Sequence, residues 1–219
     1  MQALQGRWVT DARKAVPGAD GQLLADVGRD LLARWGEPHR GYHGTSHLAE
    51  VLAAVDTLCR AGKVGRRDRS VAVLGAWFHD AVYDIGDVEG GGNERRSAAL
   101  ASRTLAELGA DPDLVDDVVT AVLDTADHDL GGGGSPSREV LHDADLWVLA
   151  APTPRFDEYC REVRREYAAV PAAAYSAARA AVLRPFLLRD HVYRTEHARR
   201  AWEPTARENL ARELTRLAA

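Results

Sequence analysis

The chain has 219 residues, and its 28 Lys and Arg against 33 Asp and Glu give a formal net charge of -5 at pH 7. Hydrophobic residues make up 46% and charged residues 28% of the sequence, which excludes a disordered chain and is typical of a globular domain. The acidic balance argues against binding of duplex nucleic acid, although local arginines could still hold a small phosphorylated molecule. We expect a single domain over residues 1–219.

The cysteine content and the distribution of apolar residues favour a cytoplasmic location. Two cysteines, Cys59 and Cys160, are too few for the disulfide framework of a secreted domain. Residues 1–18 contain no long apolar run, and no later segment reaches the length of about 20 apolar residues that crosses a bilayer. We therefore expect a soluble, cytoplasmic protein without a membrane partner.

Helical periodicity dominates the chain from one end to the other. Apolar residues recur every three to four positions, which predicts amphipathic helices, and no segment alternates as a strand would. We therefore expect an all-α helical bundle. The apolar stripes lie within residues 24–32, 48–58, 74–81, 100–108, 114–123, 182–187 and 210–217.

Glycine and proline residues mark boundaries between the expected helices. Gly62 and Gly109 stand where left-handed helix ends are expected, and Asp111 precedes a proline, as a capping residue does at the start of a helix. The glycine-rich stretches 86–92 and 131–134 predict loops, and neither matches a phosphate-binding fingerprint.

Histidine and aspartate residues interrupt three otherwise apolar segments. His79 and Asp80 lie within AVLGAWFHDAVY, and Asp145 lies within LHDADLWVL. His43 and His47 are four residues apart in GYHGTSHLAEV and can therefore face the same way across one helical turn. A buried carboxylate is costly unless a cation or several donors compensate it, so these segments predict a site that attracts a cation.

Two imidazoles and two carboxylates from separate helices would form a mixed nitrogen and oxygen site with open positions for water. Carboxylates favour harder ions such as Mn²⁺ and Fe²⁺, and imidazoles accept these as well as Co²⁺, Ni²⁺ and Zn²⁺. The residue types therefore predict a divalent transition metal and leave its identity open. The alternative is purely structural, and it requires each polar group to be compensated separately.

The order His47, then His79 and Asp80, then Asp145 resembles the H…HD…D signature of the HD-domain superfamily of metal-dependent phosphohydrolases, an all-α fold. The segment YHGTSHLAEV resembles the YHNxxHAxDV segment of cyclic-nucleotide phosphodiesterases. In those enzymes the second histidine binds metal and the first is a candidate proton donor. By that resemblance His47 is a ligand and His43 a general acid.

Nearly the whole chain is similar to a bacterial group described as predicted HD-superfamily phosphohydrolases. In HD proteins the last ligand is commonly the Asp of an Ala-Asp pair, which favours Asp145 as the ligand and leaves Asp143 to support the ligands from behind. The similar stretches are YHGTSHL, WFHDAVYD, NERRSA, DADLWVL, the EVRREYAAVP region and the RPFLLRDHVYRT region.

This resemblance implies hydrolysis of a phosphoester in a small phosphorylated metabolite, such as a nucleotide, by a metal-activated water. Asp80, or Asp145 through its free oxygen, would accept the proton of that water, and His43 would protonate the departing oxygen. The structural alternative for His43 is a cap of the following helix.

Further candidates lie outside this core set. His128 is expected to hold a second metal or a phosphate, or else to be a solvated residue beside a glycine-rich loop. Glu94 is expected either to accept a hydrogen bond behind the ligands or to provide a favourable charge at a helix start. Arg164 and Arg189 are the preferred contacts to a substrate phosphate, ahead of Arg95 and Arg179.

Two other functions remain open at the level of sequence. Some HD-fold proteins carry additional histidine ligands, hold two irons and use O₂ to cleave carbon bonds, and His128 keeps such a di-iron oxygenase as an alternative. The other is a binding module for a metal or a nucleotide that has kept the fold and lost turnover.

Overall fold

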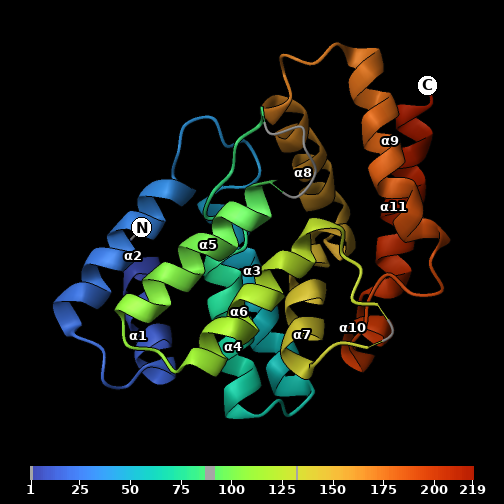
Figure 1. The fold of residues 1–219 in the computed structure, drawn as a ribbon. Helices are drawn as coiled ribbons and strands as arrows, with labels where there is room; N and C mark the ends of the chain where they lie inside the picture. Colours follow the sequence, from blue (N-terminus) through green and yellow to red (C-terminus); the bar gives the residue numbers. More distant parts are fainter. Residues whose placement is uncertain (1, 87–91, 132) are drawn as a thin grey trace.

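The computed structural model describes residues 2–86, 92–131 and 133–219. Every regular element within these ranges is a helix, as the periodicity predicts (Figure 1). The helices are α1 (Gln2–Ala15), α2 (Gly21–Trp35), α3 (Thr45–Ala61), α4 (Arg66–Phe78), α5 (Gly92–Glu107), α6 (Pro112–Leu123), η1 (Asp124–Ala126), α7 (Pro136–Asp145), η2 (Leu146–Ala150), α8 (Thr153–Glu166), α9 (Ala172–Leu188), α10 (Glu196–Ala201) and α11 (Glu203–Leu217). None of the helices among these residues has the length and apolar character needed to span a bilayer.

Helix α4 lies at the centre of the fold. It packs against α1, α3, α6 and α7, and every residue from Val71 to Phe78 is buried. The sequence analysis expects an amphipathic stripe here, whereas the helix is covered on all sides. Gly75 allows α4 and α7 to pack closely, because a Cβ atom at this position would lie only 2.7 Å from Cδ2 of Leu141 on α7.

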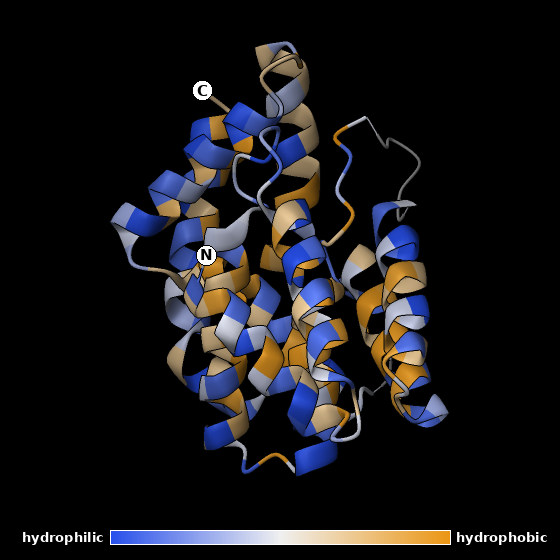
Figure 2. Ribbon diagram, turned by 90° about the vertical axis from the view of Figure 1, so that its left-hand side faces the viewer, coloured by the Kyte–Doolittle hydropathy of each residue, from blue (hydrophilic) through white to orange (hydrophobic). Residues whose placement is uncertain are grey.

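The remaining helices form pairs around this centre. The pair α1 and α2 lies at the blue end of Figure 1, α5 packs against α6, and α9 runs beside α11 at the red end. Figure 2 shows hydrophobic positions in orange and hydrophilic positions in blue alternating along these helices, as amphipathic helices require. The side that faces α4 supplies much of the apolar core.

The helix ends agree only in part with the boundaries expected from sequence. The side chain of Asp111 caps α6 by accepting from the backbone N–H of Asp113, and Gly109 is left-handed at φ 77°, so both expectations are confirmed. Gly62 has φ -82°, and the left-handed residue is instead Lys63 at φ 51°. Of the two predicted glycine-rich loops, residues 87–91 and 132 lie outside the described residues.

Candidate metal centre

The mutual packing of α3, α4 and α7 brings together the ligands predicted from sequence. His47 lies in the first turn of α3, His79 and Asp80 follow directly after the last residue of α4, and Asp145 is the last residue of α7. Because these three helices contact one another, residues far apart in the chain meet at one point. Helix ends are well suited to this role, since their positions are determined by the packed core.

Most of the nitrogen and oxygen distances within this cluster suit ligands around a single ion. Nε2 of His47 lies 3.1 Å from Nε2 of His79, and Oδ1 of Asp145 lies 3.2 Å and 3.4 Å from these two atoms. Oδ2 of Asp80 lies 3.7 Å from the first and 3.4 Å from the second. Two ligand atoms about 2.1 Å from one ion, at angles of roughly 90° to 110°, are about 3.0 to 3.4 Å apart.

The orientation of the imidazole rings also fits a metal. Nδ1 of His79 donates to the carbonyl oxygen of Ala76 at 2.9 Å, which leaves the lone pair of Nε2 directed into the cluster. The ring of His47 packs against Tyr42, with 4.6 Å between ring centroids. Atoms of His47, His79 and Asp80 all lie within 4.8 Å of one another, so this buried group could hold a metal ion.

The charges of the cluster favour a cation at the same point. Burial disfavours protonated His79, but the carboxylates of Asp80 and Asp145 outweigh it and raise its pKa to about 9. Burial alone would raise the pKa of Asp145, yet His79 and His47 hold it well below its usual range. Burial lowers the pKa of His47. If His79 served as a ligand, it would have to release its proton, and a bound cation would replace the charge of that proton beside the two carboxylates.

Removing this ion is expected to lower thermal stability, because an ion that binds only the folded state shifts the unfolding equilibrium. An ion at 100 times its dissociation constant stabilises the fold by about 2.7 kcal/mol, which for a domain of this size raises Tm by about 5 to 10 °C. Scanning calorimetry of chelated and reconstituted protein measures the difference. An identical Tm in both samples contradicts a bound ion.

His43 is held beside the cluster by a carboxylate that the sequence analysis did not single out. Oε2 of Glu166, the last residue of α8, lies 2.8 Å from Nδ1 of His43, while Oε1 accepts from the backbone N–H groups of Gly41, Tyr42 and His43, each at 2.8 Å. Gly41 is required here, because a Cβ atom would lie 2.5 Å from the carbonyl oxygen of Glu162.

The Glu166 carboxylate also determines the proton occupancy of His43. Burial disfavours the protonated ring, but the hydrogen bond that His43 donates to Glu166 and the charge of Asp80 outweigh it and raise the pKa of His43. Burial likewise opposes ionisation of Glu166, yet the hydrogen bond from His43 outweighs it and lowers the pKa of Glu166 to about 2. The raised pKa favours the protonated form of His43, and its ring stacks on Tyr83, with ring centroids 4.3 Å apart.

Arg40 is a second residue that the sequence analysis missed. Its side chain is almost completely buried, and Nη1 donates to the carbonyl oxygens of His43 at 2.9 Å and Asp80 at 2.8 Å. It therefore ties the loop that carries His43 to the loop that carries Asp80. Only its proximity to the GYHGTSH segment could have indicated this role, because its second carbonyl partner, Asp80, lies 40 positions away in the chain.

Three of the further candidates, His128, Glu94 and Arg189, line a cavity that lies beside the cluster. His128 is in the left-handed region at φ 52°, with Nε2 3.8 Å from Oδ2 of Asp145, and burial lowers its pKa to about 4. Glu94 lies in the first turn of α5. Arg189 donates to the carbonyl oxygen of His128 at 2.9 Å.

Asp143 and Arg164 lie elsewhere and have other partners. The carboxylate of Asp143 accepts from the backbone N–H groups of Arg194 and Thr195 and from His142, so it anchors the C-terminal segment rather than supporting the ligands. Arg164 donates to the carbonyl oxygens of Tyr167 and Val170 beyond the end of α8 and does not line the cavity. Both placements correct the sequence-based expectation.

The cavity beside the cluster has a volume of about 710 Å³. The two carboxylates of the cluster and His43 line it, whereas His47 and His79 lie behind them, so the open side of the cluster faces the cavity. Its walls combine aromatic and aliphatic side chains with polar ones such as Asn93 and Asp127. The aromatic lining residues are Tyr42, Tyr83, Tyr159, Tyr167, Tyr175 and Phe186.

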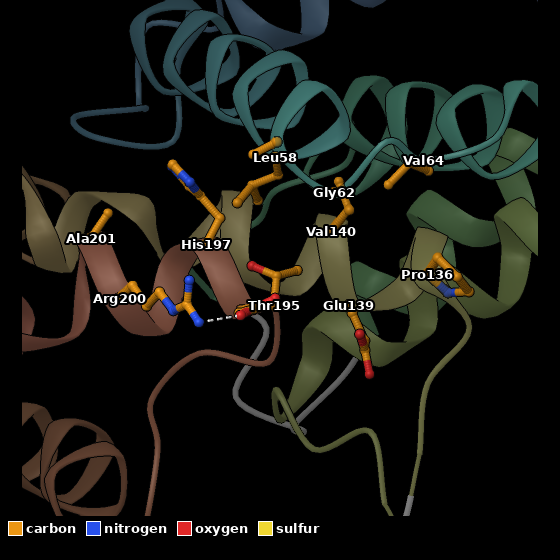
Figure 3. Close-up of a pocket in the computed structure, with 12 residues that line it drawn as sticks. Leu58, Gly62, Val64, Pro136, Glu139, Val140, Thr195, His197, Arg200 and Ala201 are labelled. Atoms are coloured by element: carbon orange, nitrogen blue, oxygen red, sulfur yellow. Dashed lines mark ion pairs between the residues drawn. The ribbon is translucent and has the colours of Figure 1, made fainter.

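A second hollow, of about 440 Å³, lies away from this cluster (Figure 3). It is lined by the end of α3, including Leu58, by the start of α7 and by α10. Leu58 is about 16 Å along α3 from His47, at 1.5 Å per residue. The ion pair drawn there joins Arg200 and Glu196, so these charges already compensate each other.

The chain matches no family model, no curated protein and no solved structure in the comparisons. A function is therefore inferred from the residues of the cavity and their geometry.

Proposed function

We propose that the protein is a metal-dependent phosphohydrolase that cleaves a phosphoester bond in a small phosphorylated metabolite. The observation that supports this most strongly is the combination of groups on one cavity. The carboxylates of Asp80 and Asp145, backed by His47 and His79, lie at the same cavity as His43, whose raised pKa favours the protonated ring. The resemblance of the H…HD…D order to HD-domain phosphohydrolases points in the same direction.

Each residue has a distinct task in this proposal. His47, His79, Asp80 and Asp145 would hold a divalent transition ion, which when bound lowers the pKa of a water and polarises a phosphoryl oxygen. Asp80 accepts the proton of the attacking water. His43, kept protonated by Glu166, donates a proton to the departing oxygen. Arg189 pairs with an oxygen of the phosphoryl group from the opposite wall.

The proposal is tested by phosphate release. Protein reconstituted separately with Mn²⁺, Fe²⁺, Co²⁺, Ni²⁺ or Zn²⁺ is incubated anaerobically with a panel of phosphorylated metabolites, including nucleotides. We expect release of phosphate, or of a phosphomonoester from a diester, with at least one of these ions. Absence of hydrolysis with every ion across the panel contradicts the proposal.

Replacing His43 by glutamine is expected to slow turnover while leaving the metal bound, because His43 does not belong to the ligand set. General acid catalysis contributes about 10²- to 10⁴-fold, and the loss grows as the leaving group becomes more basic. We expect a fall of about 100-fold or more with alkyl phosphates and a much smaller fall with 4-nitrophenyl phosphate. Steady-state rates and metal content are measured together, and equal slowing of both substrates removes His43 from the acid role.

His128 supports a second candidate function, an HD-fold di-iron oxygenase. Its Nε2 atom lies 3.8 Å from the outer oxygen of Asp145, so a second ion could be held between these two side chains. Iron-loaded protein would then consume O₂ in the presence of substrate. Oxygen-electrode measurements on the substrate panel separate this function from hydrolysis, which proceeds without O₂.

A further inference from the structure

Arg179 on α9 is a cation without an anionic partner in the wall of the cavity. Its Nη2 donates to the hydroxyl of Tyr159, and its guanidinium lies 5.0 Å from the centroid of that ring. Nε is buried and makes no hydrogen bond, and Arg179 forms no ion pair with a carboxylate within the described ranges of the chain. The guanidinium remains charged at any physiological pH.

Arg155 and Arg40, two other partly buried arginines near the cavity, are paired with carboxylates, whereas Arg189 in the cavity wall bonds to backbone carbonyl groups. Arg155 pairs with Glu50 and Glu162, at 2.5 Å and 2.9 Å. Arg40 pairs with Glu37 at 3.0 Å in addition to its bonds with backbone carbonyl groups. Arg179 is half-buried and its Nε is fully buried, and a partly buried charge without a counterion is costly, so Arg179 is best explained by an anion that arrives with a ligand.

The position of Arg179 separates this anion from the candidate metal centre. Phe186, on the same helix, packs against His128, with 5.8 Å between ring centroids, and so marks the end of the cavity near the metal centre. Arg179 lies about 10 Å further along α9, at 1.5 Å per residue. Ring contacts also connect the two ends in steps. Tyr159, which contacts Arg179, packs on Tyr42, and Tyr42 packs on His47, with 4.6 Å between the centroids of each pair.

Apolar side chains form a large part of the cavity wall. They include Leu149 and Val163 and, between Arg179 and Phe186 on α9, Leu183. A ligand that reaches from the metal centre to Arg179 therefore passes along hydrophobic and aromatic side chains, which favours an aromatic or aliphatic body over a highly polar one.

We propose that Arg179 binds a second anionic group, a carboxylate or a phosphate, at the end of the substrate opposite to the phosphoryl group that is cleaved. This inference rests on the proposed phosphohydrolase function, because that function identifies the group at the metal centre as a phosphoryl group. It defines the substrate class as a phosphoester whose leaving group has an apolar body and carries its own negative charge.

Binding of paired phosphonates, which cannot be hydrolysed as esters are, tests this assignment without turnover. Phenylphosphonate and biphenylphosphonate are compared with their para-carboxylated and para-phosphonylated forms by isothermal titration calorimetry. The second anion is expected to tighten binding at least about 10-fold, as a charge-assisted hydrogen bond does, and more with the spacer that spans the cavity better. The same ratio is expected in metal-free protein, because Arg179 rather than the ion supplies it.

Variants of Arg179 test whether this residue causes the preference for the second anionic group. Arg179→Met is expected to abolish the preference for the second anion, Arg179→Lys to retain part of it, and Arg184→Met, an exposed arginine on the same helix, to retain all of it. If Arg179→Met does not fold, the ratio in the wild-type protein and in Arg179→Lys decides. No preference in the wild-type protein, or an unchanged preference in Arg179→Met, overturns the inference.

The outcome for the proposed function is read separately. Release of phosphate without any preference for a second anion overturns the role of Arg179 alone. An intact preference for phosphonates that carry a second anionic group, in a protein that hydrolyses no phosphoester, supports the role of Arg179 and overturns the phosphohydrolase assignment. The carboxylate and phosphonate arms then identify which second group the site prefers.

Discussion

Replacing Asp80 by asparagine is expected to remove both the metal ion and the activity. Asp80 and Asp145 are the two anionic donors of the cluster, and the amide that replaces Asp80 keeps the shape of the side chain but not its charge. The variant also lacks the group that accepts the proton of the attacking water. We expect kcat/KM to fall by at least about 1,000-fold, which corresponds to about 4 kcal/mol of transition-state stabilisation.

Metal content after dialysis, measured by emission spectrometry, and kcat/KM are determined on the same preparations. Asp116→Asn is the matched control, because Asp116 is an exposed aspartate on α6 and has the same change in charge. The control is expected to keep its metal and its rate. Full metal content together with full activity in Asp80→Asn would show that the cluster is not the reactive centre.

The buried His and Asp cluster could be predicted from sequence in part because the signal of His79 and Asp80 is local. His79 and Asp80 end a run of apolar residues that can only be buried, so their polarity in that context was visible without a structure. The helical periodicity was equally local, and the all-α fold follows from it. What periodicity did not show is that α4 is surrounded on all sides, since this depends on how four other helices pack around it.

The residues that sequence analysis misplaced depend on direction or on distant partners. Asp143 and Asp145 differ by two positions, which on a helix turns their side chains by about 200°, so one faces the C-terminal segment and the other the cluster. Arg164 and Arg179 could not be ranked without knowing which face of each helix lines the cavity. Glu166 meets its partners from more than 120 positions away in the chain.

The distribution of roles around the cavity has a structural logic. The ligands lie at the ends of helices that belong to the core, whereas His43 lies in a loop just before α3. A loop needs additional restraint to hold a catalytic side chain, because its backbone N–H groups have no partners in a helix. Glu166 and Arg40 supply that restraint from two sides, through backbone N–H groups and backbone carbonyl groups respectively.

Glu166→Gln is therefore expected to destabilise the fold and to impair the loop that carries His43. The wild-type carboxylate has a pKa of about 2 in the folded protein against an ordinary value of 4.5. Because the folded pKa is the lower one, ionised Glu166 stabilises the folded state fully above pH 4.5, and this stabilisation is lost as the pH falls toward 2. The difference corresponds to about 3 kcal/mol.

Urea unfolding of the wild-type and variant proteins between pH 3 and 6 measures this effect. In the wild-type protein the pKa of His43 is raised above its ordinary value of 6.5, so His43 titrates above this pH range. The free energy of unfolding of Glu166→Gln is expected to lie about 2 to 4 kcal/mol below that of the wild type at pH 6, with the gap narrowing toward pH 3. Glu158→Gln, an exposed change on the same helix, should stay within about 0.5 kcal/mol of the wild type. A gap that is independent of pH would mean that Glu166 acts through its shape rather than through its charge.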